Sequence, residues 1–182
     1  MAETDESLRK LRELRAHAHP VRLRILSLLT GSALTAAEVG RELGMTHANA
    51  SYHLRQLLAA GIIQVVGEER IRGGTAKRYR YDLDRDLELT GVPRTDSVHS
   101  GPRRQVYAAF AQELRRRGAR VASTPNRAHA TDAELWVDPA LWEELKSTVD
   151  DVADRLHRAA RPARTPGTIL VSATYVMFEM RP

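Results

Sequence analysis

The segment "THANASYHLRQLLAAGII", from Thr46 to Ile63, decides the fold. Stepping about 100° per residue around a helix places Ala50, Leu54 and Leu57 together on one apolar face. The opposite face centres on Tyr52 and carries small or hydrogen-bonding side chains but no acidic residue. A face that only meets solvent usually mixes glutamate with lysine. The pattern therefore predicts an amphipathic helix whose polar face lies against another surface.

Three helices are expected before this segment. The first spans about Ser7 to Ala16, with leucines forming a narrow apolar stripe, and the second begins at Pro20, which suits a first helical turn. The third begins after Thr35, and Glu38 three positions later completes a capping box. Thr46 caps the helix that follows. The order is that of a helix-turn-helix unit with a preceding helix.

After this unit the hydrophobic period changes from helical to strand-like. "IIQVVGEERIRGGTAKRYRYDL", residues 62–83, has two arms with Gly73 and Gly74 near the tip, as in a β-hairpin. In the second arm, alternate tyrosines and arginines point to opposite faces. The three helices from Pro20 onward, followed by a two-stranded ribbon, predict a winged helix-turn-helix.

The fold class expected for the whole chain is α+β and mainly helical. We expect a winged helix-turn-helix DNA-binding domain in residues 1–84, a linker in 85–101 and a C-terminal dimerisation or effector region in 102–182. That region should contain a helix from about residue 102, a strand over 133–137, a long helix after Asp138-Pro139 and a final strand within 165–180.

Composition excludes several classes of protein. The chain has no cysteine, which removes disulfides and thiolate chemistry, and no uncharged apolar run long enough to cross a bilayer. No nucleophile elbow, phosphate loop or dinucleotide motif is present, so we expect no enzyme activity, catalytic residue or cofactor. The formal net charge is +5, which favours a polyanionic partner. The expected compartment is the cytoplasm.

The side chains on the outer face of the 46–59 helix suit double-stranded DNA. Asparagine and glutamine pair with adenine, arginine pairs with guanine, and serine or tyrosine binds phosphate. Arginines and a lysine in the hairpin would reach neighbouring phosphates or the minor groove. The predicted DNA-binding residues are His47, Ala48, Asn49, Ser51, Tyr52, Arg55, Gln56, Arg70, Arg72, Lys77, Arg78 and Arg80. A merely solvated helix face is the alternative.

The sequences "AHAHPVRLRILSLL" and "LTAAEVGRELGMTHANASYHLRQLLAAGIIQVV" resemble the arsenical-repressor (ArsR/SmtB-type) winged-helix regulators over about residues 14–82. The resemblance implies a dimer whose helix over 46–59 enters the major groove, with residues 70–78 at the wing tip. The extra length after residue 85 resembles an extended actinobacterial-type branch, which implies assembly or effector roles.

Many members of that family sense metals, but this sequence lacks the residues that would bind the metal. The helix before the turn has no cysteine, and Asp154 with His157 makes only a two-ligand site, which is poor for zinc. We expect no metal. His17 and His19 suit capping or packing beside Pro20, and His53 suits a packed position at the rim of the core that also touches phosphate.

The aromatic side chains of the C-terminal region have two interpretations. They form either a core or dimer interface, or an apolar effector pocket between the long helix and the last strand. The pocket hypothesis names Trp136, Trp142, Tyr175 and Phe178 as ligand-binding residues.

The sequence as a whole predicts a homodimeric transcription regulator, a repressor, that binds an inverted-repeat DNA operator and no membrane. One alternative is a ligand-responsive sensor whose small-molecule effector releases the DNA. Another is a winged-helix module that binds protein instead. Phosphate contacts predict binding that weakens steeply with salt, whereas a protein-interaction module predicts little salt dependence.

Overall fold

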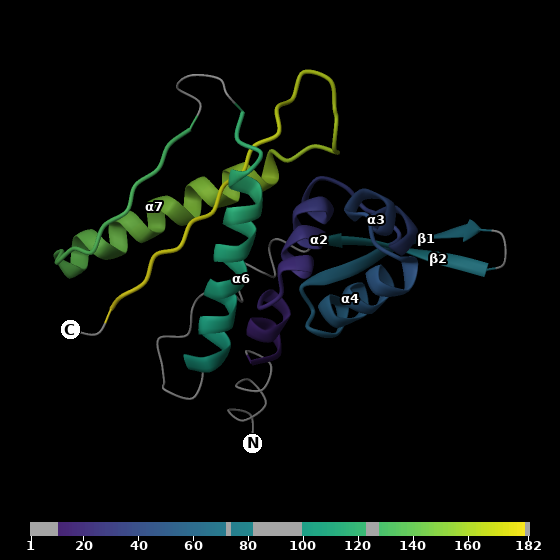
Figure 1. Ribbon diagram of the computed structural model, residues 1–182, viewed down its shortest axis with the longest axis horizontal. Coiled ribbons are helices and arrows are strands. Elements are labelled where there is room, and N and C mark those ends of the chain that lie inside the picture. The colour runs from purple at the N-terminus through teal and green to yellow at the C-terminus, as the bar shows by residue number, and fades with distance from the viewer. Residues whose placement is uncertain (1–10, 72–73, 82–99, 123–127, 181–182) are drawn as a thin grey trace.

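The computed structural model describes residues 11–71, 74–81, 100–122 and 128–180. Figure 1 shows a helix-turn-helix with a projecting hairpin on one side and two longer helices, α6 and α7, on the other. Helical residues 11–17 precede α2. The fold is therefore α+β and mainly helical, as the sequence predicts. Among the described residues, no helix has the length and apolar character needed to span a membrane.

The core of the first part lies between three short helices: α2 (Pro20–Gly31), α3 (Ala36–Leu43) and α4 (His47–Ala59). The side chains of Ile25, Leu29, Leu54, Leu57 and Ile62 are fully buried there. Burying each such side chain contributes about 1.5–3 kcal/mol to the free energy of folding. Apart from Ile62, which follows α4, these residues lie on the apolar faces expected from the helical period, so sequence spacing accounts for most of the core.

Side-chain caps fix where the helices begin. The imidazole of His19 accepts a hydrogen bond from the Val21 amide at the start of α2. The Thr35 hydroxyl accepts one from the Glu38 amide, while the Glu38 carboxylate accepts one from the Thr35 amide at 2.7 Å. This reciprocal pair confirms the predicted capping box. The Thr46 hydroxyl caps α4 by accepting a hydrogen bond from the Asn49 amide, without a reciprocal side-chain bond.

The turn between α3 and α4 depends on two glycines. Gly44 ends α3 with φ at 66°, a left-handed conformation that glycine adopts without steric cost. Gly40 lies so close to the turn that an added Cβ would be 3.0 Å from the carbonyl oxygen of Met45. Together they let the chain reverse within three residues and set α4 across α3.

The hairpin consists of β1 (Ile63–Ile71) and β2 (Gly74–Tyr81), paired antiparallel. A bulge between Val65 and Gly67 bends β1. Leu34 and Tyr79 exchange backbone hydrogen bonds of 3.0 and 2.9 Å, which tie β2 to the segment between α2 and α3. The hairpin is therefore anchored at its base and projects beyond the helices (Figure 1).

Helix α6 (Ser100–Gly118) packs beside α2 (Figure 1), with Val106 and Ala109 buried. It begins at Ser100, two residues inside the predicted linker, and residues 85–99 of that linker lie outside the described residues. The Glu113 carboxylate is buried and bonds Arg116 in a two-pronged pair, with Arg117 3.4 Å away. The basic end of α6 is thus partly neutralised by its own helix.

Helix α7 (Pro139–Arg158) confirms the long helix expected after Asp138, whose carboxylate caps it. The two strands expected around it are wrong as intrachain strands. Residues 133–137 and 168–180 belong to no helix or strand, and Figure 1 draws them as open traces. The ring of Phe178 stacks on Tyr107 of α6 at 5.2 Å between centroids. Strand formation needs a hydrogen-bonded neighbour, and the described part of the chain supplies none.

The segment after α7 returns to the helix-turn-helix. A Cβ added at Gly31 would clash with the carbonyl oxygen of Arg161, so the two backbones are in close contact. The guanidinium of Arg164 bonds both carboxylate oxygens of Glu42 at 3.1 Å. Residues 159–167 therefore contact the helix-turn-helix, in addition to the packing of α6 on α2.

Candidate nucleic-acid interface

Helix α4 has one buried and one open face. Ala50, His53, Leu54 and Leu57 are buried, and they recur at the spacing of an amphipathic helix. Between them the exposed side chains carry no acidic group from His47 to Ala59. The helix therefore presents a continuous polar surface free of negative charge.

Most of the α4 residues predicted to bind DNA lie on this open face. Tyr52 is 50% exposed, and Ser51 is half-buried. The Arg55 side chain is exposed and forms no hydrogen bond or ion pair with another described residue. The exposed members of the predicted set are His47, Ala48, Asn49, Tyr52, Arg55 and Gln56. The structure brings these residues together on one surface.

A histidine pair joins the inner side of α4 to the start of α2. The rings of His53 and His19 lie 4.8 Å apart, and the ring of Tyr52 meets His53 edge-on at 5.2 Å. His53 Nδ1 is buried and has no hydrogen-bond partner among the described residues. Desolvation lowers the pKa of His53, as do the nearby His19 and Arg22, and desolvation also lowers the pKa of His19. The lowered pKa values favour the uncharged form of both rings, which contact each other between α2 and α4.

The wing divides its predicted basic residues between different places. Arg70 and Lys77 are exposed toward the tip, where Lys77 is paired in register with Glu68. Arg72 lies outside the described residues. Arg70 and Lys77 are therefore accessible to a binding partner.

Arg78 makes contacts within its own subunit, and its predicted contact with DNA stays a prediction. Its guanidinium donates to the Glu69 carboxylate and to the carbonyl oxygen of Ala33, both at 2.7 Å, and lies 3.5 Å from the Glu38 carboxylate. These partners come from β1, from the loop after α2 and from α3. The side chain therefore connects the wing to the helical core, a role that β-strand alternation alone does not reveal.

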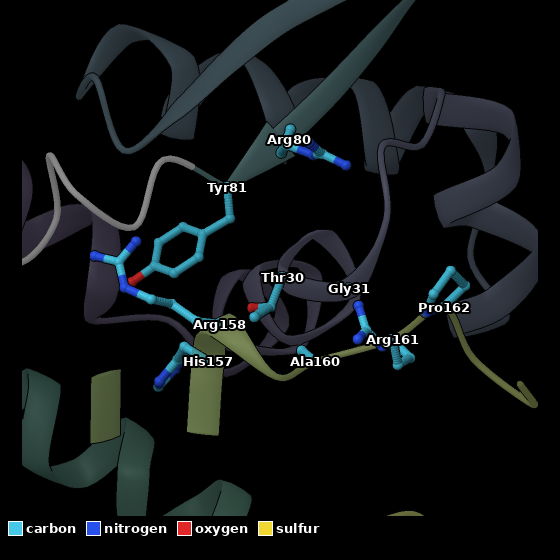
Figure 2. Close-up of a pocket in the computed structure, with 9 residues that line it drawn as sticks. All are labelled: Thr30, Gly31, Arg80, Tyr81, His157, Arg158, Ala160, Arg161 and Pro162. Carbon is cyan, nitrogen blue, oxygen red and sulfur yellow. The ribbon is translucent and has the colours of Figure 1, made fainter. Parts of the chain in front are cut away.

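Arg80 lies at the base of the wing, away from the tip. It lines a hollow of about 430 Å³ with Tyr81, the end of α2 and the end of α7 (Figure 2). Figure 2 shows Arg158 and His157 of α7 beneath the Tyr81 ring. The rings of Tyr81 and His157 are 6.3 Å apart. Arg80 is thus grouped with the C-terminal region and not with the other predicted wing residues.

The four residues of the predicted apolar pocket do not enclose a common cavity of the kind found at the wing base. Trp136 is 92% exposed, Tyr175 and Phe178 are about half-exposed, and Trp142 is half-buried. The 430 Å³ hollow and a second one at the wing tip are lined by other residues. Ligand binding by these aromatic residues stays a prediction.

The structure gives Asp154 and His157 ordinary helix-surface partners. Asp154 accepts from the Arg158 guanidinium at 2.8 Å, and His157 Nδ1 lies 2.7 Å from the carbonyl oxygen of Ala153. In the described ranges no three histidine or acidic side chains are grouped as metal ligands. The pair therefore offers no metal site beyond the two ligands seen in the sequence.

Residues 18–66 match the sequence model of a family described as a helix-turn-helix domain. No curated protein matches the chain. The matched range contains α2, α3, α4 and the start of β1, which is the unit whose geometry is described above. A helix-turn-helix domain therefore occupies this part of the chain, and such a domain indicates a DNA-binding regulator.

Proposed function

We propose that the protein is a transcription regulator that binds double-stranded DNA sequence-specifically as a homodimer, with α4 in the major groove. The observation that carries the proposal is the acid-free open face of α4. Phosphates flank the major groove on both sides and would repel a carboxylate there. This face is the only part of α4 that a groove can reach, because the other face is buried in the core.

The groups on this face match the chemistry of base edges. Asn49 and Gln56 offer amides that pair with adenine, and Arg55 offers a guanidinium that pairs with guanine. Ala48 leaves the first turn of α4 small, so the backbone can approach the bases closely. Thr46 holds that turn by bonding the amide of Asn49 at 3.2 Å, which orients the recognition residues before DNA arrives.

The wing supports the same orientation. Arg70 and Lys77 extend the basic surface beyond the helices toward the adjacent backbone or minor groove. Arg78 contributes by holding the wing against α3 through Glu38, with no need to touch phosphate itself. Arg72 stays a predicted phosphate contact, since it lies at the wing tip in sequence. Arg80 also stays a predicted phosphate contact. Because it lies at the base of the wing, it reaches a phosphate only where the DNA bends toward that base.

The homodimer and the repressor role rest on the resemblance of residues 14–82 to ArsR/SmtB-type regulators. Two recognition helices related by a two-fold axis would bind an inverted repeat with half-sites about 34 Å apart, or a multiple of that distance. A repressor acts by occupying such a site. An effector that releases the DNA is the elaboration that the exposed aromatic residues of the C-terminal region suggest.

Selection of bound sequences from random duplex DNA tests the proposal. We expect an inverted repeat, and binding that weakens by several orders of magnitude between low and moderate salt. Enrichment of no sequence, together with binding that ignores salt, would favour the protein-interaction alternative. A symmetric site whose affinity does not change when Arg55 is replaced would leave the protein a DNA binder but remove α4 as its recognition helix.

A further inference from the structure

The C-terminal region contains two segments that have the sequence of strands but no strand partner. Residues 168–178, "TILVSATYVMF", contain no charged residue and are rich in β-branched and aromatic side chains. No backbone–backbone hydrogen bond joins residues 169–180 or 129–137 to any other described residue. Their amides and carbonyls are thus open for pairing along both segments.

The same region exposes most of the large apolar side chains that the described residues leave uncovered. Fifteen of twenty-one lie between Leu135 and Met180, among them Trp136 at 92% and Leu170 at 88% exposed. Three of the fifteen are aromatic side chains, which carry about 150–250 Å² each, and with the twelve others the exposed surface is on the order of 1,000 Å². A stable interface needs about 800 Å² from each partner.

Helix α7 continues this surface. Leu141, Leu145, Val152 and Leu156 follow one stripe at 37–44% exposure, and no residue of α7 is buried. This stripe of a twenty-residue amphipathic helix is only partly covered by its own subunit. The exposed stripe of α7 and the two unpaired segments can therefore be buried by the same partner surface.

The absence of charged residues from 168–178 indicates which kind of partner buries this surface. A neutral, apolar segment has no ionic complement with which to select an unlike protein, and left open it would promote aggregation. An identical segment related by a two-fold axis can pair with it antiparallel. Each copy then supplies the backbone hydrogen bonds that the other copy lacks. The proposed function independently requires two copies, and this inference rests on it.

We infer that residues 168–180 pair antiparallel with the same residues of a second copy, forming an intermolecular β-sheet that α7 and residues 133–137 cover. The contact at Gly31 and the Arg164–Glu42 pair link each half of this sheet to its own helix-turn-helix. The sheet therefore sets the separation of the two recognition helices as well as joining the subunits.

Light scattering coupled to size exclusion tests the inference on the full chain without DNA. The 20.4 kDa chain should elute at twice its mass. Leu170→Lys should raise the dimer dissociation constant at least about a hundredfold, because two lysines would enter an apolar sheet. Leu170 is almost fully exposed in the subunit, so the substitution removes no intrachain core contact. Ile71→Lys, an exposed apolar residue of β1 with 51% exposure, is the matched control and should stay dimeric.

Hydrogen exchange tests the backbone pairing directly. The amides of residues 169–180 should exchange slowly in the wild-type protein and rapidly in Leu170→Lys. Unprotected amides in a wild-type dimer would overturn the inference, because the subunits would then be joined by side chains alone. A monomeric wild-type protein, or a Leu170→Lys variant that remains as tightly dimeric as Ile71→Lys, would also overturn it.

The proposed function is tested separately in the same samples. A monomeric Leu170→Lys protein should still bind a half-site duplex in a salt-dependent manner. If dimerisation fails as expected but no protein form binds DNA, the proposed function is wrong and the sheet stands. If DNA binding persists in a monomeric wild-type protein, the sheet and the homodimer of the proposed function are both wrong, and DNA binding through α4 stands.

Discussion

Two arginines on neighbouring elements should respond to alanine in opposite ways. Arg55 extends from the open face of α4 without an ion pair or hydrogen bond to any described residue. Arg78 is 32% exposed and is bound to Glu69, Glu38 and a backbone carbonyl. We therefore expect Arg55→Ala to affect DNA binding and Arg78→Ala to affect folding stability.

The magnitudes follow from these contacts. Arg55→Ala should change the free energy of unfolding by no more than about 0.5 kcal/mol, as is usual for exposed positions. It should weaken specific DNA binding by about 1–3 kcal/mol, which is roughly fivefold to 150-fold in Kd, and relax the preference at one base pair. Arg78→Ala removes two hydrogen bonds that its charged guanidinium donates, one to the Glu69 carboxylate and one to the Ala33 carbonyl. Because its side chain is partly solvated, we expect a stability loss of about 1–2 kcal/mol.

Urea unfolding followed by circular dichroism measures the first quantity, and fluorescence anisotropy with the selected duplex measures the second. Arg120→Ala, an exposed arginine beyond α6, controls for loss of one positive charge. Arg78→Ala should lower affinity for all duplexes only as far as the wing moves, with little change in the salt slope. If Arg55→Ala lowers stability by more than 1 kcal/mol and leaves Kd unchanged, the assignment of the α4 face is refuted.

Three further changes test the surroundings of the interface. Lowering the pH from 6.5 should destabilise the protein, because the pKa of His53 is depressed below 6.5 by burial and the unfolded chain binds the proton first; His53→Gln, compared by urea unfolding at pH 7.5 and 5, should show a smaller loss. Glu38→Ala should lower the unfolding free energy by about 0.5–2 kcal/mol through the lost cap of α3. The pKa of Glu38 is lowered mainly by its bond to the Thr35 amide, so this difference should fade as the pH falls below 4.5, and an unchanged difference at pH 3 would contradict it. Gly31→Ala should cost about 1–3 kcal/mol, since its methyl would displace the Arg161 backbone; a wild-type urea midpoint would show that this contact is absent in solution.

Local sequence rules account for the helix-turn-helix. Caps at Thr35 and Thr46, the left-handed Gly44 and the spacing of Ala50, Leu54 and Leu57 each depend on neighbours within a few residues. Because the interactions are short in sequence, the element order, the capping box and the exposed face of α4 could all be predicted before any coordinates.

Local sequence rules do not predict contacts between residues that are distant in the sequence. Strand alternation places Arg78 and Arg80 on the same face, yet Arg78 binds Glu38 and Ala33 while Arg80 lines the hollow beside α7. Likewise, the β-pattern of residues 168–180 predicts an extended backbone but not its partner. A strand is defined by what pairs with it, and that neighbour is absent from the described part of the subunit.

The sequence by itself determined the helices of the helix-turn-helix, which face of α4 stays polar, and that the strands within residues 63–71 and 74–81 pair as a hairpin, since each follows from the period and the caps of a single segment. Only the tertiary structure decided that Arg78 holds the wing, that His53 packs on His19, and that residues 159–167 lie against Gly31 and Glu42. Those outcomes depend on which segments meet in space, and amino-acid spacing along one segment contains no information about the segment it will meet.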